Sequence, residues 1–129
     1  ELGYNKKDLV RKKGTVLRIV RDSKISLNIK RLYSFECQVC RTAIKTKSGL
    51  YAEGAHIKPL GKPHEGDDST DNILCLCPNH HVMFDKGSFS IDDNFNLTGE
   101  LAGAMNVHTE HKIDIKNVRY HRDSHGYSE

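Results

Sequence analysis

The sequence predicts a small α+β domain built from two short strands, a short helix and a bound metal. Three features indicate this: two short apolar runs bounded by turn-forming residues, a proline that starts a helical segment after the second run, and pairs of cysteine and histidine around these elements. The 129 residues suffice for one hydrophobic core. With 36% hydrophobic residues and no tryptophan that core is lean, so a metal would contribute to its stability.

The first 35 residues predict a basic arm followed by a helix. They contain ten Lys and Arg against three acids, in a chain whose net charge is only +3. We interpret residues 1–21 as a basic linker or arm that could hold a polyanion, although a solvated linker has the same composition. Asp22 and Ser23 can cap the helix. Its apolar face is formed by residues at helical spacing, namely Ile25, Ile29, Leu32 and Tyr33.

The centre of the chain predicts the two strands and the short helix. Residues 49–57 form a short strand after a polar turn, and residues 72–76 form a second, apolar strand. The connection between them, residues 59–70, is rich in proline, glycine and acids and is expected to be a loop. Pro78 suits the first position of a helix that Gly87 ends.

The C-terminal part predicts a hairpin, a strand and a tail. Residues 88–99 alternate in hydrophobicity on either side of an Asp-Asp-Asn turn, which indicates a hairpin. Residues 112–118 are expected to form another strand, and residues 119–129 a polar tail to which the sequence assigns no particular structure. We expect residues 22–129 to form one domain.

The sequence lacks the patterns of membrane-spanning and secreted proteins. No apolar run approaches the length of a membrane span, and no signal-peptide pattern opens the chain. We therefore expect no membrane partner and a cytoplasmic location, where thiols stay reduced. Because the sequence begins at Glu1 without a methionine, we expect it to be the C-terminal part of a longer protein.

Four residues predict a structural zinc site. Cys37 and Cys40 have the two-residue gap of a zinc knuckle, and Cys77 and His80 repeat that gap with an imidazole as the second donor. Cys75 has the wrong spacing and lies in an apolar run, so we expect it to be a buried small hydrophobic residue. Disulfides are the alternative, and a reducing compartment disfavours them.

The other histidines of the central segment suggest a second, catalytic ion. His81 and Asp85 lie one helical turn apart and project from the same face, so they can jointly hold Mg²⁺ or Mn²⁺. His56 ends the first strand and can act as a general base across a cleft. Asn72 begins the second strand, where its amide can brace the backbone of the long loop or the base histidine. Each of these residues also has a purely structural interpretation, and only their joint arrangement favours a catalytic site.

These segments together resemble the HNH nuclease motif, the ββα-metal fold, in its zinc-stapled form. The resemblance is to the HNH domains of restriction-type endonucleases, including modification-dependent enzymes that also carry a methylcytosine-reading domain. It is densest between Cys37 and Asp85. The segments that carry it are CQVC (37–40), GAHIKPLG (54–61), DNILCLCPNHHVMFD (71–85) and, more loosely, IVRDSKISLNIKRLYSF (19–35) and RYHRD (119–123).

The resemblance implies a fold and an activity. The fold is a ββα-metal core with structural zinc knuckles, preceded by a helix and followed by a short β-hairpin. The activity is metal-dependent hydrolysis of phosphodiester bonds in double-stranded DNA, with His56, Asn72 and His81 as the catalytic residues. A separate DNA-recognition domain in the same polypeptide and a homodimer are further expectations.

Ala55 departs from the pattern of the family. Many HNH proteins place an Asp or His metal ligand at this position. We therefore expect the catalytic ion to depend on Asp85, with Glu53, on the same side of the strand as Ala55, as the second choice. The departure leaves an alternative function open, namely a catalytically inactive zinc module that binds nucleic acid or protein. A nicking or RNA-directed nuclease is a weaker alternative, because folds are reused for many functions.

Overall fold

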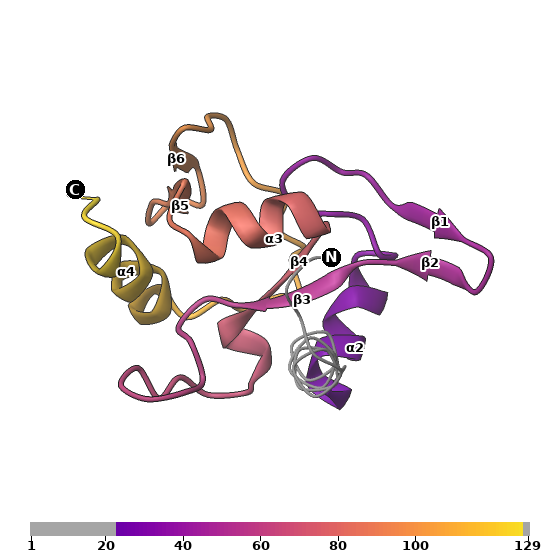
Figure 1. Ribbon diagram of the computed structural model, residues 1–129, viewed down its shortest axis with the longest axis horizontal. Helices are drawn as coiled ribbons and strands as arrows, with labels where there is room; N and C mark the ends of the chain where they lie inside the picture. Colours follow the sequence, from indigo (N-terminus) through magenta and orange to yellow (C-terminus); the bar gives the residue numbers. More distant parts are fainter. Residues whose placement is uncertain (1–22, 128–129) are drawn as a thin grey trace, which may run out of the picture.

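The computed structural model describes residues 23–127. The basic arm expected at residues 1–21 lies outside the described residues, as does Asp22. The helices and strands follow in this order: α2 (Lys24–Leu32), β1 (Ile44–Thr46), β2 (Gly49–Tyr51), β3 (Glu53–His56), the 3-10 helix η1 (Thr70–Asn72), β4 (Ile73–Leu76), α3 (Pro78–Asp85), β5 (Phe89–Ile91), β6 (Leu97–Gly99) and α4 (Ile115–Ser124). Within this part of the chain the strands pair as three separate two-stranded antiparallel sheets (Figure 1). The predicted α+β class is confirmed.

The antiparallel pair β3–β4 lies at the centre of the molecule, between helices α2 and α3 (Figure 1). β4 is buried along its whole length, and its side chains alternate between two hydrophobic clusters. Leu74 packs with Phe84 of α3 in the larger cluster. Ile73 and Cys75 pack with Ile29 of α2 in the smaller one. This arrangement is the predicted ββα core with its preceding helix.

Helix α2 begins at the predicted residue and approaches β3 closely. The Ser23 hydroxyl accepts a hydrogen bond from the Ser26 amide and so caps the helix N-terminus. A side-chain carbon added at Gly54 of β3 would lie 2.1 Å from the Ser26 hydroxyl oxygen. Glycine at this position therefore allows the close packing of α2 on the strand that ends at His56.

The segment predicted as one strand at residues 49–57 forms two strands. β2 pairs with β1 in a hairpin, and after Ala52 the chain continues as β3, which pairs with β4 instead. The Thr46 hydroxyl accepts a hydrogen bond from the Ser48 amide and donates one to the Gly49 carbonyl, which closes the hairpin turn. The hairpin projects from the body of the molecule (Figure 1). Its strands are mostly exposed, so they lack the hydrophobic alternation that would predict them.

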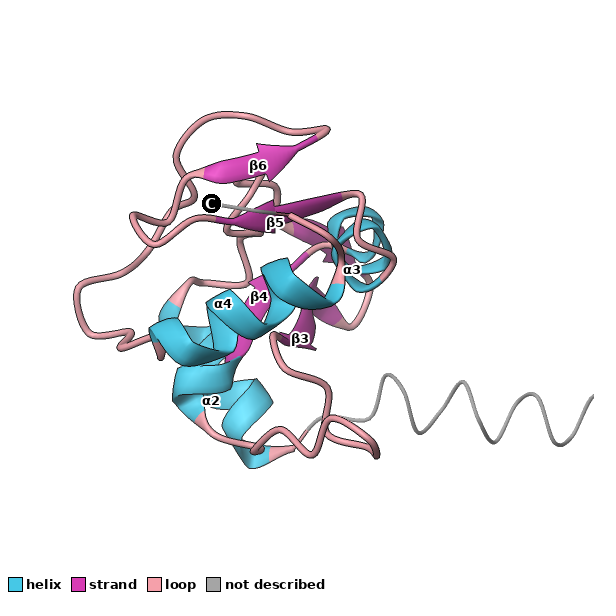
Figure 2. Cartoon of the chain, turned by 90° about the vertical axis from the view of Figure 1, so that its left-hand side faces the viewer, coloured by secondary structure: helices cyan, strands magenta, loops and turns pink. Residues whose placement is uncertain are grey.

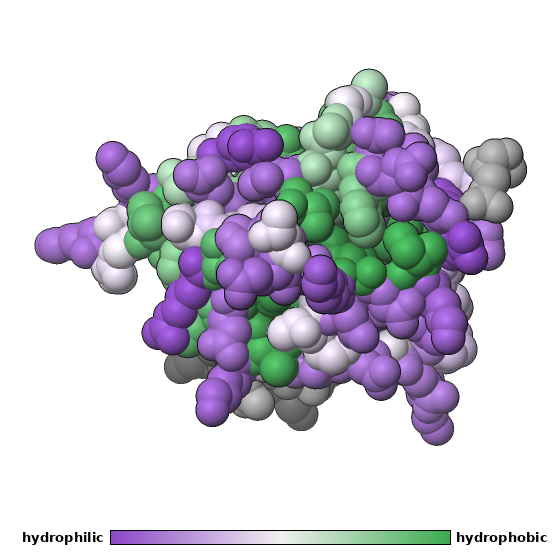
Figure 3. All heavy atoms as spheres, turned by 180° about the vertical axis from the view of Figure 1, so that it is seen from behind, coloured by the Kyte–Doolittle hydropathy of each residue, from purple (hydrophilic) through white to green (hydrophobic). Residues whose placement is uncertain are grey.

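The C-terminal hairpin adds to the hydrophobic core. The hairpin predicted at residues 88–99 is confirmed as β5–β6, and it contributes buried apolar side chains to the larger cluster. On the face seen from behind, hydrophobic residues show between projecting polar side chains (Figure 3).

None of the helices between residues 23 and 127 has the length and hydrophobicity needed to cross a bilayer.

Helix α4 corrects one prediction. The strand expected at residues 112–118 is wrong, because a helix occupies residues 115–124. The same helix gives a structure to residues 119–124 of the polar tail, for which the sequence predicted none. The Asp114 carboxylate caps this helix by accepting a hydrogen bond from the Lys116 amide. Two of its three buried residues are polar, so hydrophobic periodicity does not reveal the buried face. These residues are Val118, His121 and Arg122.

Helix α4 lies beside β5 (Figure 2). The polar side chains on its buried face have hydrogen-bond partners on the neighbouring elements. His121 Nε2 donates a hydrogen bond to the Phe84 carbonyl at 2.9 Å, and its Nδ1 accepts one from the Ser90 hydroxyl at 2.7 Å. Its ring stacks on the Phe84 ring with a centroid separation of 3.8 Å. Arg122 Nη1 donates to the Ile91 carbonyl at 2.8 Å. These bonds attach α4 to the end of α3 and to β5.

Acidification is expected to destabilise the protein through His121. Burial lowers the pKa of His121 from 6.5 to about 4, so the folded protein keeps this ring neutral while the unfolded chain takes up a proton. The unfolded state therefore binds more protons between these two values. The free energy of unfolding should fall as the pH decreases through this window, by up to about 3 kcal/mol. Urea denaturation at a series of pH values measures the fall.

The variant His121→Gln is the matched control for this pH dependence. Its amide can still donate to the Phe84 carbonyl but does not titrate. Acid effects on other groups are present in both proteins, so the difference between their curves belongs to His121. If the stability of the two proteins falls in parallel with pH, the prediction is wrong.

Candidate active site and metal centre

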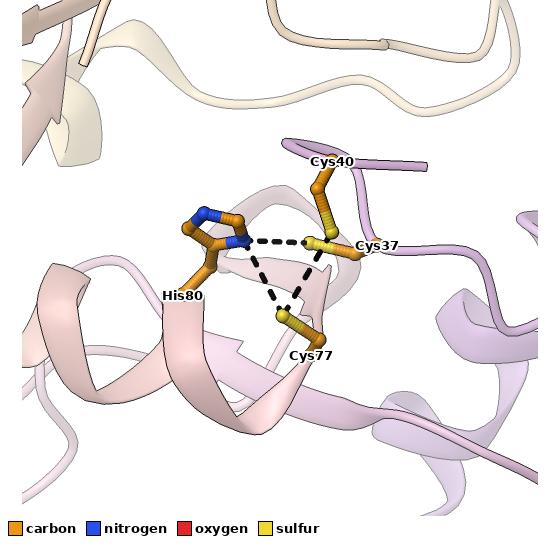
Figure 4. Close-up of side chains that lie close together, drawn as sticks. All are labelled: Cys37, Cys40, Cys77 and His80. Atoms are coloured by element: carbon orange, nitrogen blue, oxygen red, sulfur yellow. Dashed lines mark hydrogen bonds between the residues drawn. The ribbon is translucent and has the colours of Figure 1, made fainter. Parts of the chain in front are cut away.

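Three cysteines and one histidine converge near the start of α3 (Figure 4). A ligand atom from each of Cys37, Cys40, Cys77 and His80 lies within 4.8 Å of the other three. We refer to these four residues as the Cys/His cluster. They are the four residues whose spacing predicts a zinc site, and the structure brings all of them together.

The separations within the Cys/His cluster fit a tetrahedral ion. His80 Nδ1 lies 3.6 Å from Cys37 Sγ and 3.3 Å from Cys77 Sγ. Cys40 Sγ lies 3.9 Å from Cys77 Sγ. Zinc bonds of about 2.0–2.3 Å at tetrahedral angles place neighbouring ligand atoms roughly 3.5–3.8 Å apart. Burial also lowers the pKa of His80, which favours the neutral imidazole that a metal requires. The donor set is therefore consistent with zinc.

The local fold positions both halves of the cluster. In the turn at residues 37–40, Gln38 is fully buried and pairs with the edge of β4. Its backbone N–H donates to the Cys75 carbonyl at 2.8 Å, and its side-chain oxygen Oε1 accepts from the Cys75 backbone N–H at 2.9 Å. α3 begins directly after Cys77, so His80 follows within the first helical turn. The cluster thus joins the turn to the strand and helix of the central core.

Cys75 lies apart from the Cys/His cluster. It is fully buried on β4 and packs with Ile29 and Tyr33 in the smaller hydrophobic cluster. Burial raises the pKa of its thiol to about 12, so the thiol stays neutral. Cys75 is therefore buried among hydrophobic residues, as the sequence predicts.

A cleft of about 280 Å³ lies at the ends of β3 and α3. We refer to it as the histidine cleft, because four histidines and one carboxylate form much of its polar lining. These residues are His56, His81, Asp85, His121 and His125. The cleft therefore contains the predicted base together with both predicted ligands of the catalytic ion, and none of the Cys/His cluster.

β3 carries His56 to one wall of the cleft, where an acid from the long loop holds its ring. His56 Nε2 lies 2.9 Å from Asp68 Oδ1. The side chain of His56 is 23% exposed, so it is accessible to solvent in the cleft. A carboxylate on one ring nitrogen fixes the orientation of the other, which is the arrangement that a general base needs.

Asn72 is fully buried at the end of η1 and holds both ends of the long loop. Its Nδ2 donates to the Lys58 carbonyl at 2.9 Å and to the Asp67 carbonyl at 2.8 Å. Its Oδ1 accepts from the Lys58 amide at 2.8 Å. Lys58 follows His56 by two residues and Asp67 directly precedes Asp68, so these bonds hold the carboxylate near the ring. The amide braces the loop backbone, one of the two roles that the sequence suggests.

His81 lies between two carboxylates. Its Nε2 is 3.2 Å from Asp85 Oδ2, and its Nδ1 is 2.8 Å from Glu53 Oε1. Burial lowers the pKa of His81, but the hydrogen bonds and charges of Asp85 and Glu53 outweigh it, so the net pKa is raised. A ring nitrogen and a carboxylate oxygen at 3.2 Å can chelate one ion through bonds of about 2.1 Å.

Ala55 has no side-chain atom that can bind a metal. Because it is buried in the core, a larger ligand side chain at this position would displace its neighbours. Ala55 is fully buried, pairs with Leu74 and packs in the larger hydrophobic cluster. Among residues 23–127, the Cys/His cluster is the one group in which three or more donors meet. An ion at His81 and Asp85 would therefore have two protein ligands, with water or phosphate completing its shell, as is common for Mg²⁺.

Three residues of this region are absent from the predicted site. Asp68 belongs to an acidic loop, and nothing in its local sequence marks it as the partner of His56. His121 and His125 come from α4 and the residue after it, which the sequence analysis assigns to a tail. Their spacing of four residues is typical of one helical face and is the signal that could have indicated their shared position.

Comparisons with known proteins agree with this geometry. The sequence profile of a family described as HNH endonuclease matches residues 37–92. Anaredoxin from Nostoc sp. (strain PCC 7120 / SAG 25.82 / UTEX 2576) is 32% identical over 69 residues, which cover 54% of this chain and 82% of Anaredoxin. The solved structure of a modification dependent TagI restriction endonuclease is 42% identical, with a TM-score of 0.77. The match covers 81% of this chain and 38% of that endonuclease, so this chain corresponds to less than half of it.

Proposed function

The chain belongs to the HNH endonuclease family, and from this premise we propose that it is a metal-dependent endonuclease domain that hydrolyses phosphodiester bonds in double-stranded DNA. The observation that supports this proposal is the histidine cleft, which His56 shares with the pair His81 and Asp85. We assign the domain to the cleavage module of a restriction-type enzyme. The likeness to the TagI restriction endonuclease at 42% identity supports that assignment.

His56 is the general base of the proposed reaction. It takes a proton from a water molecule, whose oxygen attacks phosphorus while the bond from phosphorus to the 3′ oxygen breaks. The leaving oxygen then takes a proton from solvent, which gives a 5′ phosphate and a 3′ hydroxyl. Asp68 orients the ring of His56, and Asn72 holds the loop that presents Asp68.

His81 Nε2 and Asp85 Oδ2 are the atoms that would hold the catalytic Mg²⁺ or Mn²⁺. When bound, such an ion stabilises the charge that develops on the phosphate and on the leaving oxygen. The Asp85 side chain is 53% exposed, which leaves room for water and a phosphate oxygen around the site. His81 is less exposed and provides the rigid side of the pair.

The Cys/His cluster would hold a structural Zn²⁺. Four protein ligands close a zinc site and leave no position for substrate. Cys77 and His80 lie at the start of α3, whereas Asp85 lies at its end. The zinc would therefore stabilise the fold from outside the histidine cleft.

A catalytically inactive zinc module is the second candidate function. The buried Ala55, where many HNH proteins have a ligand, favours this candidate. Such a module needs the Cys/His cluster, but it does not need His56, His81 and Asp85 in one cleft. Their common position therefore favours the endonuclease. Cleavage activity separates the two functions.

Plasmid cleavage tests the proposed function. Mild EDTA treatment is expected to stop cleavage while the zinc remains bound, because thiolate ligands hold zinc more tightly than two ligands hold Mg²⁺. Added Mg²⁺ or Mn²⁺ should then restore cleavage. Modified and unmodified plasmids form separate arms of the assay and test whether modification is required. A folded, zinc-containing protein that cuts neither plasmid with either ion would favour the inactive module.

Replacing Asp85 should affect the catalytic ion and spare the zinc. Asp85→Ala removes one of the two protein ligands, so at limiting Mn²⁺ we expect cleavage to fall by more than the roughly 10- to 100-fold that the loss of an outer-shell partner causes. Metal analysis should still find one zinc per chain. Asp123→Ala, which removes an exposed carboxylate of α4, is the matched control and should cleave like the parent. If Asp85→Ala cleaves like the parent and Glu53→Ala does not, Glu53 is the ligand.

A further inference from the structure

Glu53 is the second carboxylate beside His81, and the proposed mechanism gives it no role. Its side chain is 16% exposed, much less than that of Asp85. Both of its oxygens have partners on the protein. Oε1 lies 2.8 Å from His81 Nδ1, and Oε2 accepts a hydrogen bond from the Tyr51 hydroxyl at 2.5 Å. A half-buried carboxylate with both oxygens engaged is held in one orientation.

The geometry of the imidazole ring separates the role of Glu53 from that of Asp85. The two ring nitrogens point away from each other, so an ion bound at Nε2 lies on the far side of the ring from the group at Nδ1. Asp85 is at Nε2 and lines the histidine cleft with His56. Glu53 is at Nδ1 and is not part of that lining, although it borders a second hollow beside α3 together with His81 and Asp85. The ligand atoms of these three residues do not all lie within 4.8 Å of one another, so Glu53 is not placed to bind the ion beside Asp85.

We propose that Glu53 is a positioning residue that holds His81 as the tautomer protonated at Nδ1 and so presents the Nε2 lone pair to the ion beside Asp85. This inference rests on the proposed function, because it assigns Glu53 to the support of the proposed ion site. A carboxylate that accepts the N–H of a ligating histidine fixes the ring and increases the basicity of the ligating nitrogen. Tyr51 holds the carboxylate in turn, so the β1–β2 hairpin is connected to helix α3 through this pair.

The tautomer of His81 in the zinc-loaded, EDTA-treated protein gives a direct test. Nitrogen-15 NMR of the ring is measured at a pH high enough for one nitrogen to lose its proton. The parent should show a proton on Nδ1 and a bare Nε2. In Glu53→Ala the remaining carboxylate acceptor is Asp85, so the proton should move to Nε2. In Glu53→Gln the Tyr51 hydroxyl donates to the amide oxygen, which turns the NH₂ group toward Nδ1, so the proton should move to Nε2 as in Glu53→Ala.

Binding of Mn²⁺ provides the second measurement, read from the loss of the free-ion electron paramagnetic resonance signal. Glu53→Ala should weaken Mn²⁺ binding by roughly 10- to 100-fold, which is the usual effect of removing a carboxylate partner from a ligating histidine. Glu110→Ala, an exposed glutamate outside the cleft, is the matched control and should bind like the parent.

Two results would overturn the assignment of Glu53. One is an Nε2-protonated ring in the parent, or the same tautomer in the parent and in Glu53→Ala. The other is Mn²⁺ binding that survives in Asp85→Ala and disappears in Glu53→Ala, since Glu53 would then be a ligand. A parent protein that binds no Mn²⁺ would count against the proposed function instead. The tautomer measurement needs no ion, so it still decides the role of Glu53.

Discussion

Cys37→Ser is expected to lose its zinc and to unfold. The residue is fully buried, and its sulfur lies 3.6 Å from His80 Nδ1 in the Cys/His cluster. Structural zinc sites of this type contribute about 10–16 kcal/mol of apparent binding free energy, whereas a whole domain is stable by only about 5–15 kcal/mol. The loss of one ligand should therefore remove much of the stability of a chain with so thin a core. Metal analysis and thermal unfolding followed by circular dichroism measure the two effects.

Cys75→Ser is the matched control for the loss of zinc. This residue is also fully buried, but it lies in the smaller hydrophobic cluster and not in the Cys/His cluster. The variant should be destabilised by roughly 1–3 kcal/mol, the cost of a poorly paired buried hydroxyl, and should keep one zinc per chain. His80→Ala should lose zinc as Cys37→Ser does. A Cys75→Ser protein without zinc, together with a His80→Ala protein that retains it, would show that the ligands are assigned wrongly.

His56→Ala is expected to abolish most of the cleavage activity and to leave the fold intact. The side chain ends β3 at the wall of the histidine cleft and is 23% exposed, so its removal takes little from the core. Zinc content and DNA binding should remain close to those of the parent. Cleavage should fall by roughly 10²–10⁴-fold, which is the usual contribution of a positioned general base. Plasmid cleavage at matched zinc content and saturating Mn²⁺ measures the loss.

His108→Ala is the control for the removal of a histidine outside the cleft. His108 accepts a hydrogen bond from the Glu110 amide and lies far along the chain from β3 and α3. This variant should cleave DNA at the parental rate. A His56→Ala protein that also cuts at the parental rate would remove His56 from the mechanism. The cleft would then have no assigned base, and the inactive zinc module would be the better account of the chain.

The Cys/His cluster and the central core could be predicted because their signals are local. A tetrahedral ion requires two donors on each side at short spacing, and the pairs Cys37–Cys40 and Cys77–His80 show that spacing directly. Pro78 marks the start of α3 for an equally local reason, since it lacks the N–H that a first helical residue would leave unbonded. His56 could be placed at the end of β3 because the strand is predicted to end beside it, where the proline- and glycine-rich loop begins.

The carboxylates that hold the two histidines could not be predicted in the same way. Asp67 and Asp68 are neighbours in one acidic loop, and composition does not indicate which of them reaches His56. Asn72 decides which of the two acids reaches His56. Its side-chain amide donates a hydrogen bond to the Asp67 carbonyl, which fixes the loop so that the next side chain, Asp68, lies beside the His56 ring. Glu53 could be named as a candidate ligand from its side of the strand. Its contact with Nδ1 of His81 is what distinguishes a supporting role for Glu53 from a role as metal ligand. That contact could not be predicted, because it depends on how α3 packs on β3.

The position of α4 determines the smallest piece of this chain that could be moved intact into another protein. The segment that matches the family ends at residue 92, but a fragment cut there would uncover the Phe84 ring face on which His121 stacks. It would also leave the carbonyls of Phe84 and Ile91 without their partners in α4, and the Gly87 carbonyl without the Tyr127 hydroxyl. Unpaired carbonyls and an open aromatic face favour aggregation. A transplantable unit therefore has to extend through residue 127, well beyond the segment that matches the family.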